Sequence, residues 1–259
     1  MSRLLHNAIV RKPAANLKDG LTTVSLGLPD YERAIDQHRE YCLALEGCGL
    51  NLIRLESDDA FPDSTFVEDT AVLTERGAIL TRPGALSRRG EVTQMASTVT
   101  HWFEGAEEIV EPATVDGGDV CEVGNHYFVG ISERTNEAGA RQLKDFLIGL
   151  GHTCSLIDIP SVSNLLHLKS GLASLGDNRL VVTDALASFK EFSDYELVRI
   201  APEEDYAANC IRINDHLLIA KGYPKFAAML AGLGYRPIEL EMSEFQKLDG
   251  GLSCLSLRF

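Results

Sequence analysis

A repeated unit of strands and helices is the feature that most constrains how this chain folds. Pairs of β-rich runs joined by tight-turn sequences occupy 66–82, 117–132, 168–183 and 208–221. Segments with helical character follow them at 90–103, 136–151, 185–196 (the weakest) and 223–235, and another lies at 31–49. A short strand usually comes after each helix. The unit is therefore hairpin, helix and strand, repeating at roughly 45–50 residues.

The two ends of the chain supply the missing part of this pattern. Four units are complete, and a fifth can be assembled only if the last strand (252–259) pairs with the first (4–12). Such pairing would close a ring and leave no exposed sheet edge. Repetition alone leaves open an α/β sheet with long hairpins. Because no Pro/Ser-rich linker divides the sequence, we expect residues 1–259 to form a single catalytic domain.

Composition and charge narrow the choice of partner and compartment. The formal charge of −14 repels phosphate backbones and anionic lipids, so nucleic acid and membrane are poor partners, whereas a cationic small molecule is compatible. The six cysteines form no CxxC pair, and neither a signal-peptide run nor a bilayer-spanning segment is present. These observations predict a reduced, cytoplasmic protein.

Chemically versatile residues gather where the first strand of each unit begins. In a closed ring these starts would meet near the central axis. They read FPDSTFVEDT, TVDGGDV, LLHLKSGL, YAANC and KLDGGLSC. The candidates that they hold are Asp63, Glu68, Asp69, Asp116, Asp119, His167 and Cys254. This coincidence predicts one site built from distant segments.

A cysteine and a histidine are the candidates for nucleophilic chemistry. Cys254 follows a flexible Asp-Gly-Gly turn, and His167 enters a strand. Taken singly, a cysteine near a C-terminus is usually structural, and a histidine among leucines is usually a core residue. Their equivalent positions in the ring raise both to candidates for catalysis. Cys210 also lies at a strand start, so it could form part of the wall of the site.

The clustered acids need a cation, a metal ion or a shared proton to offset their repulsion. Their spacing is unlike a calcium loop, and zinc would call for more histidine or cysteine. A planar guanidinium fits better, because its N–H donors meet paired carboxylates in a fork. Arg88 and Arg89, in SRRGE, and Arg134, in SERTN, are candidates to anchor an α-carboxylate. The polar loop 16–23 is a candidate lid.

With these residues in place, the chain resembles the dimethylarginine dimethylaminohydrolases of the guanidino-group-modifying (pentein) superfamily. The resemblance runs from the first strand to Phe259, through LKDGLT, FPDSTFVEDT, TRPGALSRRGE, TVDGGDV, SERTNEAGARQ, LLHLKSGLA, YAANCI and DGGLSCLSLRF. It implies a five-bladed α/β-propeller, in agreement with the repeat count. It also implies an enzyme that uses neither a metal nor another cofactor and hydrolyses methylated arginine to citrulline and dimethylamine or methylamine.

The same resemblance assigns roles to individual residues. Cys254 matches the nucleophile, His167 the general acid/base, and Asp116 the acid that supports both the histidine and the guanidinium. Residues matching the substrate-binding set are Asp69 with Glu68 and Asp63 for the guanidinium side, Arg88 and Arg134 for the amino-acid end, and the carbonyls of Leu21 and Leu248 for the α-amino group. Some relatives carry glutamate in place of Asp116, which changes reach but not charge.

One departure favours a methylated substrate. Arginine deiminases and amidinotransferases have an aspartate two residues after the histidine, where this chain has Lys169. An unsubstituted guanidinium would lose a partner there, whereas a methylated edge has fewer donors to satisfy. Deimination of arginine or amidino transfer is the alternative reaction, and a non-enzymatic binder of cationic amino acids is the alternative class. The sequence leaves the choice between monomer and homodimer open.

Overall fold

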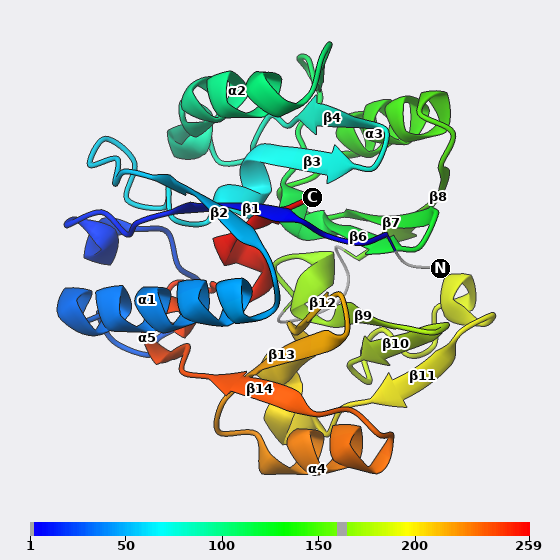
Figure 1. The fold of residues 1–259 in the computed structure, drawn as a ribbon. Coiled ribbons are helices and arrows are strands. Elements are labelled where there is room, and N and C mark those ends of the chain that lie inside the picture. The colour runs from blue at the N-terminus through cyan, green and yellow to red at the C-terminus, as the bar shows by residue number, and fades with distance from the viewer. Residues whose placement is uncertain (1–2, 160–164) are drawn as a thin grey trace.

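The computed structural model describes residues 3–159 and 165–259, which form five three-stranded sheets around a common centre (Figure 1). In every sheet the first strand is antiparallel to the second, and the second is parallel to the third. The sheets are β15 (Leu257–Arg258), β1 (Asn7–Arg11) and β2 (Asn51–Leu55); β3 (Ala71–Thr74), β4 (Gly77–Leu80) and β5 (Glu107–Glu108); β6 (Val120–Val123), β7 (His126–Ile131) and β8 (Thr153–Asp158); β9 (Leu172–Gly176), β10 (Arg179–Val182) and β11 (Glu196–Arg199); β12 (Ile211–Ile213), β13 (His216–Ala220) and β14 (Pro237–Leu240).

The two ends of the chain close the ring. Ala8 and Ile9 of β1 pair antiparallel with Arg258 and Leu257 of β15, and Figure 1 shows dark-blue β1 beside the red C-terminal segment. The predicted pairing of the terminal strands is confirmed, and an open sheet is excluded. The fold is the predicted five-bladed α/β-propeller.

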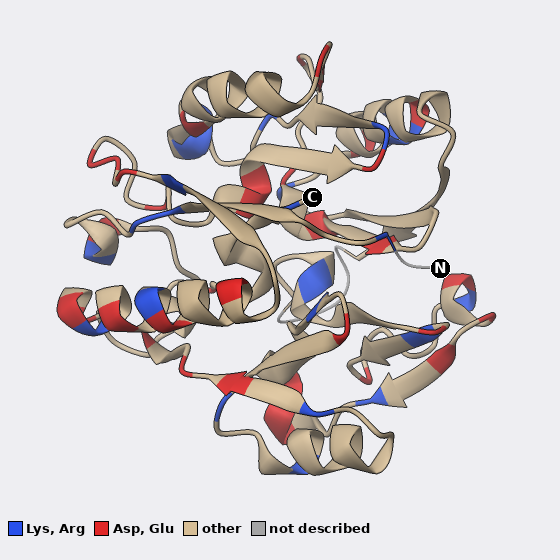
Figure 2. Ribbon diagram, in the orientation of Figure 1, with Lys and Arg blue, Asp and Glu red and all other residues tan. Residues whose placement is uncertain are grey.

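The helices cover the outside of the ring. They are α1 (Tyr31–Gly47), α2 (Glu91–Trp102), α3 (Glu137–Gly149), α4 (Pro224–Gly232) and the short α5 (Ser243–Gln246). The side chain of Asp30 caps α1 by accepting from the N–H of Arg33, while Tyr41 and Leu45 bury its inner face. Its exposed residues include both acids and bases, among them Asp36, Arg39 and Glu40, and Figure 2 shows both colours along the helix. Among the described residues, none of the helices combines the length and apolarity that a membrane crossing demands.

The segment 185–196 differs from expectation. Instead of an α-helix it forms turns and one short 3-10 helix, η6 (Lys190–Phe192). Its aromatic side chains explain the difference: Phe192 is fully buried, and Phe189 and Tyr195 pack against the same core cluster. These three residues recur at every third position, a spacing that suits a 3-10 turn, in which side chains at i and i+3 lie in line, as well as an α-helix.

Short 3-10 helices stand at the five strand starts where the sequence concentrates its acids. They are η2 (Val67–Thr70), η4 (Gly117–Asp119), η5 (Leu168–Ser170), η7 (Pro202–Ala208) and η8 (Ser253–Leu255). In ring order, η8 contacts η2, η2 contacts η4, η4 contacts η5, and η5 contacts η7. The hydroxyl of Tyr206 in η7 donates to the carbonyl of Gly250, before η8, at 2.8 Å. The segments that carry the candidate residues therefore converge.

Candidate active site

A cavity of about 30 Å³ lies where these segments meet. Nine of the ten residues to which the family resemblance assigned a role line it, and Glu68 is the exception. Asp119, Arg89 and Cys210, which the sequence also marked as candidates, do not line it. The lining residues are Leu21, Asp63, Phe66, Asp69, Arg88, Asp116, Arg134, Leu166, His167, Leu248, Asp249, Gly250 and Cys254. Cys254, near the C-terminus, thus shares a cavity with acids from the first half of the chain.

His167 and Asp116 form a buried pair in this cavity. Nε2 of His167 lies 3.1 Å from Oδ2 of Asp116, whose Oδ1 accepts from the N–H of Gly84 at 2.8 Å. Burial opposes a charge on the imidazole. The hydrogen bond to Asp116 and the negative charges of Asp119 and Asp69 outweigh burial and raise the pKa of His167 to about 9. The imidazole is therefore protonated at neutral pH and can donate a proton.

Asp69 is held by a buried arginine and a backbone N–H. Its Oδ2 lies 2.5 Å from Nη1 of Arg88, and its Oδ1 accepts from the N–H of Gly118 at 2.8 Å. Burial alone would raise the pKa of Asp69, but the Arg88 charge and the nearby His167 lower it to about 2. Asp69 is therefore a fixed negative charge on the cavity wall.

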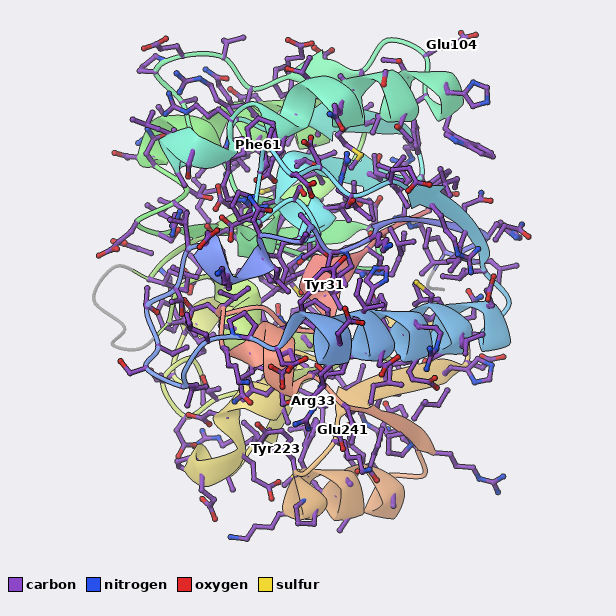
Figure 3. The ribbon with its side chains drawn as sticks, turned by 90° about the vertical axis from the view of Figure 1, so that its left-hand side faces the viewer. Tyr31, Arg33, Phe61, Glu104, Tyr223 and Glu241 are labelled. Carbon is purple, nitrogen blue, oxygen red and sulfur yellow. The ribbon has the colours of Figure 1, made fainter. Side chains whose placement is uncertain are left out.

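Arg88 is fixed from its other side by Glu91. Nε and Nη2 of Arg88 donate to the two oxygens of Glu91 at 3.0 and 2.8 Å, and Nη2 also donates to the carbonyl of Phe66 at 2.9 Å. Glu91 begins α2 directly after Gly90. A Cβ on Gly90 would meet the ring of Phe61, labelled beside α2 in Figure 3, at 2.3 Å, so a glycine brings the arginine loop close.

Cys254 lies in η8 and is partly exposed. The N–H of Gly251 points at its sulfur, with 3.4 Å between N and Sγ. A Cβ on Gly251 would approach the Asn209 amide at 2.5 Å, which explains why the turn before the cysteine needs glycine. Burial, followed by the charges of Glu68 and Asp69, raises the pKa of Cys254 to about 12. Without a cation in the cavity the sulfur is a neutral thiol.

The candidate lid is tied to two sides of the cavity. The N–H of Leu21 donates to Oδ1 of Asp63 at 3.0 Å, and the hydroxyl of Thr22 donates to the carbonyl of Lys247 at 2.9 Å. The N–H of Thr23 donates to Oδ2 of Asp249 at 2.5 Å. These contacts join the loop before α1 to the segment that precedes the cysteine, so the loop lies closed.

Glu68 faces a second, larger cavity. One of its oxygens lies 2.5 Å from Nζ of Lys169 and 3.3 Å from Nη2 of Arg258, and the other accepts from Ser253 Oγ at 2.7 Å. This cavity of about 560 Å³ is also lined by Cys210. Glu68 therefore does not line the cavity of Cys254, although its charge acts on the cysteine sulfur. It holds η8 through Ser253, one residue before the cysteine.

Three side chains meet the spacing of a metal site but have other partners. Single ligand atoms of Asp69, Asp116 and His167 lie within 4.8 Å of one another. The carboxylates are already engaged by Arg88, Gly118 and Gly84, and the histidine nitrogen Nε2 by Asp116. This donor set suits a planar cation with N–H donors better than a bare ion.

Several contacts were not anticipated from the sequence. Phe66, Leu166, Asp249 and Gly250 line the cavity, and Glu91 clamps Arg88. The i,i+3 spacing of Arg88 and Glu91 was a usable signal for the clamp. The sequence carried no such signal for the apolar part of the cavity wall, because a phenylalanine or leucine beside an acidic motif resembles an ordinary core residue.

Fold and site together define a member of the guanidino-group-modifying class. A family model described as "Arginine deiminase" matches residues 58–220, which is more than half of the chain. The acids, histidine and cysteine around one cavity agree with that class.

Full-length relatives narrow the assignment. The chain is 46% identical to the N(G),N(G)-dimethylarginine dimethylaminohydrolase of Pseudomonas aeruginosa over 99% of its own length and all of the relative, and 37% identical to the enzyme of that name from Streptomyces coelicolor over 97% and 96%. It matches the structure of a Cys-to-Ser variant of the Pseudomonas aeruginosa protein complexed with citrulline at a TM-score of 0.96 and 44% identity, covering 99% and 100% of the two chains. The chain belongs to the dimethylarginine dimethylaminohydrolase family.

Proposed function

We propose that this protein hydrolyses Nω-methylated arginines, asymmetric dimethylarginine and monomethylarginine, to citrulline and dimethylamine or methylamine. The observation that carries the proposal is that Cys254, His167, Asp116 and Asp69 surround one cavity. The names of the two full-length relatives and the citrulline in the related structure support the same reaction. Residues 1–259 would act as one catalytic domain in the cytoplasm, as a monomer or a homodimer.

The substrate would lie between two sets of opposite charge. Asp69 and Asp116 accept N–H donors of the guanidinium and keep it in plane. Arg88 and Arg134 face the α-carboxylate, and the carbonyls of Leu21 and Leu248 take the α-amino group. Asp63, hydrogen-bonded to the N–H of Leu21, holds that end of the lid. Orientation of this kind turns a poor electrophile into one placed for attack.

The first chemical step uses the two unusual pKa values. Burial and the nearby carboxylates raise the pKa of the Cys254 thiol to about 12. Binding of the cationic guanidinium beside the sulfur favours loss of the thiol proton to the solvent, which leaves the thiolate. The thiolate of Cys254 attacks the guanidinium carbon and forms a C–S bond. The C–N bond to the methylated nitrogen then breaks, and protonated His167, with its pKa near 9, gives its proton to the departing amine.

The second step releases citrulline. The cysteine now carries a thiouronium, and His167 has become neutral. It takes a proton from a water molecule, whose oxygen bonds to the same carbon. Collapse of the resulting adduct breaks the C–S bond and forms the carbonyl of citrulline. The hydroxyl proton passes to the solvent, where the released amine takes it up, and the sulfur leaves as thiolate. One water is consumed for each amine released.

A substrate panel tests the proposal. Purified protein is offered asymmetric dimethylarginine, monomethylarginine and arginine separately, and citrulline, dimethylamine, methylamine and ammonia are quantified. We expect citrulline with the methylated amine from the first two substrates and little ammonia from arginine. Ammonia as the main product would favour a deiminase. Tight binding without turnover, and without a protein adduct in mass spectra of quenched reactions, would favour a non-enzymatic binder.

A further inference from the structure

Asp119 is a fully buried carboxylate that the proposed mechanism does not use. It closes η4, and its two oxygens have different partners. Oδ1 accepts from the backbone N–H of Leu168 at 2.9 Å. Oδ2 accepts from the hydroxyls of Ser132 and Thr135 at 2.7 and 2.6 Å. Three donors from two other segments therefore meet on one side chain.

Each partner of Asp119 leads to a residue of the site. Leu168 follows His167, so the bond to its N–H fixes the backbone that carries the imidazole. The Thr135 hydroxyl accepts from the N–H of Asp116 at 3.1 Å, and the Ser132 hydroxyl accepts from the N–H of Arg134 at 3.0 Å. The histidine, its supporting acid and an arginine of the cavity wall are thus set relative to one another through a single carboxylate.

We propose that Asp119 is a positioning residue of this enzyme, which locks the His167 segment against the Asp116 and Arg134 loops and supplies a negative charge that keeps His167 protonated for release of the amine. This inference rests on the proposed function. The closely spaced pair Asp116–His167 has only one direct hydrogen bond, at 3.1 Å, so its geometry depends on the backbone around it.

Asp119 acts on His167 through its negative charge as well as through its hydrogen bonds. The groups facing His167 are Asp69 from η2, Asp116 and Asp119 from the η4 segment, Cys254 from η8, and the cavity arginines Arg88 and Arg134. After the Asp116 hydrogen bond, the charge of Asp119 is the largest influence that raises the pKa of His167. Burial raises the pKa of Asp119 itself to about 6, so it is ionised at neutral pH.

The decisive variant is Asp119→Asn, which keeps the shape and removes the charge. Its amide oxygen can still accept from Leu168, and its amide nitrogen can donate to Thr135. We expect kcat for asymmetric dimethylarginine to fall at least about tenfold with KM changed less than about threefold, and the alkaline limb of the kcat profile to move down by about 0.5–1.5 pH units. NMR titration of the His167 ring should show the same downward shift.

Two further variants separate positioning from general stability. Asp145→Asn makes the same chemical change at an exposed site on α3 and should leave kcat and the pH profile unaltered. Thr135→Val removes one donor to Asp119 and the acceptor for Asp116 but keeps the charge. It should lower kcat while the alkaline limb stays in place.

The outcomes that overturn the inference are specific. A purely structural Asp119 predicts that Asp119→Asn is less stable yet keeps the wild-type alkaline limb and His167 titration. If Asp119→Asn does not fold, undiminished kcat in Thr135→Val overturns the inference alone. If the wild type releases no methylated amine, the proposed function fails, while the NMR titration of His167 in Asp119→Asn still decides whether its charge acts on the histidine.

Discussion

Nη1 of Arg88 lies 2.5 Å from Oδ2 of Asp69, so a guanidinium of the chain occupies the carboxylate assigned to the guanidinium of the substrate. Both groups are almost completely buried, and Glu91 holds the rest of the arginine fork. A substrate with a cation at one end and a carboxylate at the other can engage both members of this ion pair. The pair is therefore a complementary template as well as a stabilising contact.

The buried network makes Arg88 costly to remove. Arg88→Ala would leave Asp69 and Glu91 as unpaired buried charges, and we expect a loss of about 3–5 kcal/mol in the free energy of unfolding, together with most of the activity. Urea denaturation measures the first effect. Arg89→Ala is the matched control: Nε of Arg89 donates to the carbonyl of Pro83, so less than about 1 kcal/mol should be lost. Equal losses in the two variants would contradict the assignment.

Cys254→Ser should abolish turnover and largely preserve substrate binding. The serine hydroxyl ionises far less readily than the thiol, while the carboxylates that hold the guanidinium are untouched. Calorimetric titration with asymmetric dimethylarginine should give an affinity close to the Michaelis constant of the wild type. Cys121→Ser, on a strand facing the larger cavity, is the comparison that should retain citrulline formation. Undiminished citrulline from the Cys254 variant would refute its role.

His167→Gly should turn over slowly and recover in part when imidazole is added. The vacated space lies beside Asp116, which can orient an added imidazole as it orients the side chain. The recovered rate should saturate with imidazole concentration and should require the protonated form for amine release. The control is His152→Gly, because His152 lies outside the cavity. This variant should keep its activity, so added imidazole should not raise its rate. A variant insensitive to imidazole at every concentration would argue against a proton-transfer role.

Stability should depend on pH through the same histidine. Its pKa is near 9 in the folded protein, above its ordinary value of 6.5. The resulting stabilisation is complete below pH 6.5 and is lost as the pH rises through 9, by up to ~3 kcal/mol. Other groups, including Cys254, also titrate at high pH. The informative quantity is therefore the difference between wild type and His167→Gly in urea midpoint across that range, and a constant difference would contradict the raised pKa.

The ring could be predicted from the sequence because the patterns that mark its strands, turns and helices are local and recur in each unit. Each hairpin is marked by a turn sequence, and the pairing of the ends follows from the incomplete fifth unit, as the Ala8–Arg258 register shows. The prediction of an α-helix at 185–196 was wrong because the helical pattern there was weak and its aromatic residues pack into the core. Tertiary packing decided that segment, and packing is invisible in a single sequence.

The residues around the cavity were predictable as a set but not in their orientation. Glu68 and Asp69 are adjacent, and the resemblance placed both beside the guanidinium. In η2 they face different cavities, one toward Lys169 and the other toward Arg88. Side-chain direction in this 3-10 turn depends on contacts with the neighbouring segments η8 and η4, so no local sequence pattern specifies it. For the same reason, only the structure shows that Glu91 holds Arg88 and that Asp119 accepts hydrogen bonds from Ser132, Thr135 and Leu168.

The lid must open for catalysis, because a cavity of about 30 Å³ has room for one or two water molecules and not for a methylated arginine. Thr23 and Asp249 form one of the contacts that hold it shut. Asp249 has φ of 58°, a left-handed conformation that asparagine also tolerates, so Asp249→Asn should change the contact without straining the backbone. We expect a weaker closed state: faster tryptic cleavage at exposed Lys18 and a several-fold higher KM. Asp177→Asn, at a hairpin turn with φ of 48°, controls for the substitution itself. If the Asp249 variant matched this control in cleavage rate and KM, the Thr23–Asp249 contact would have no part in holding the lid.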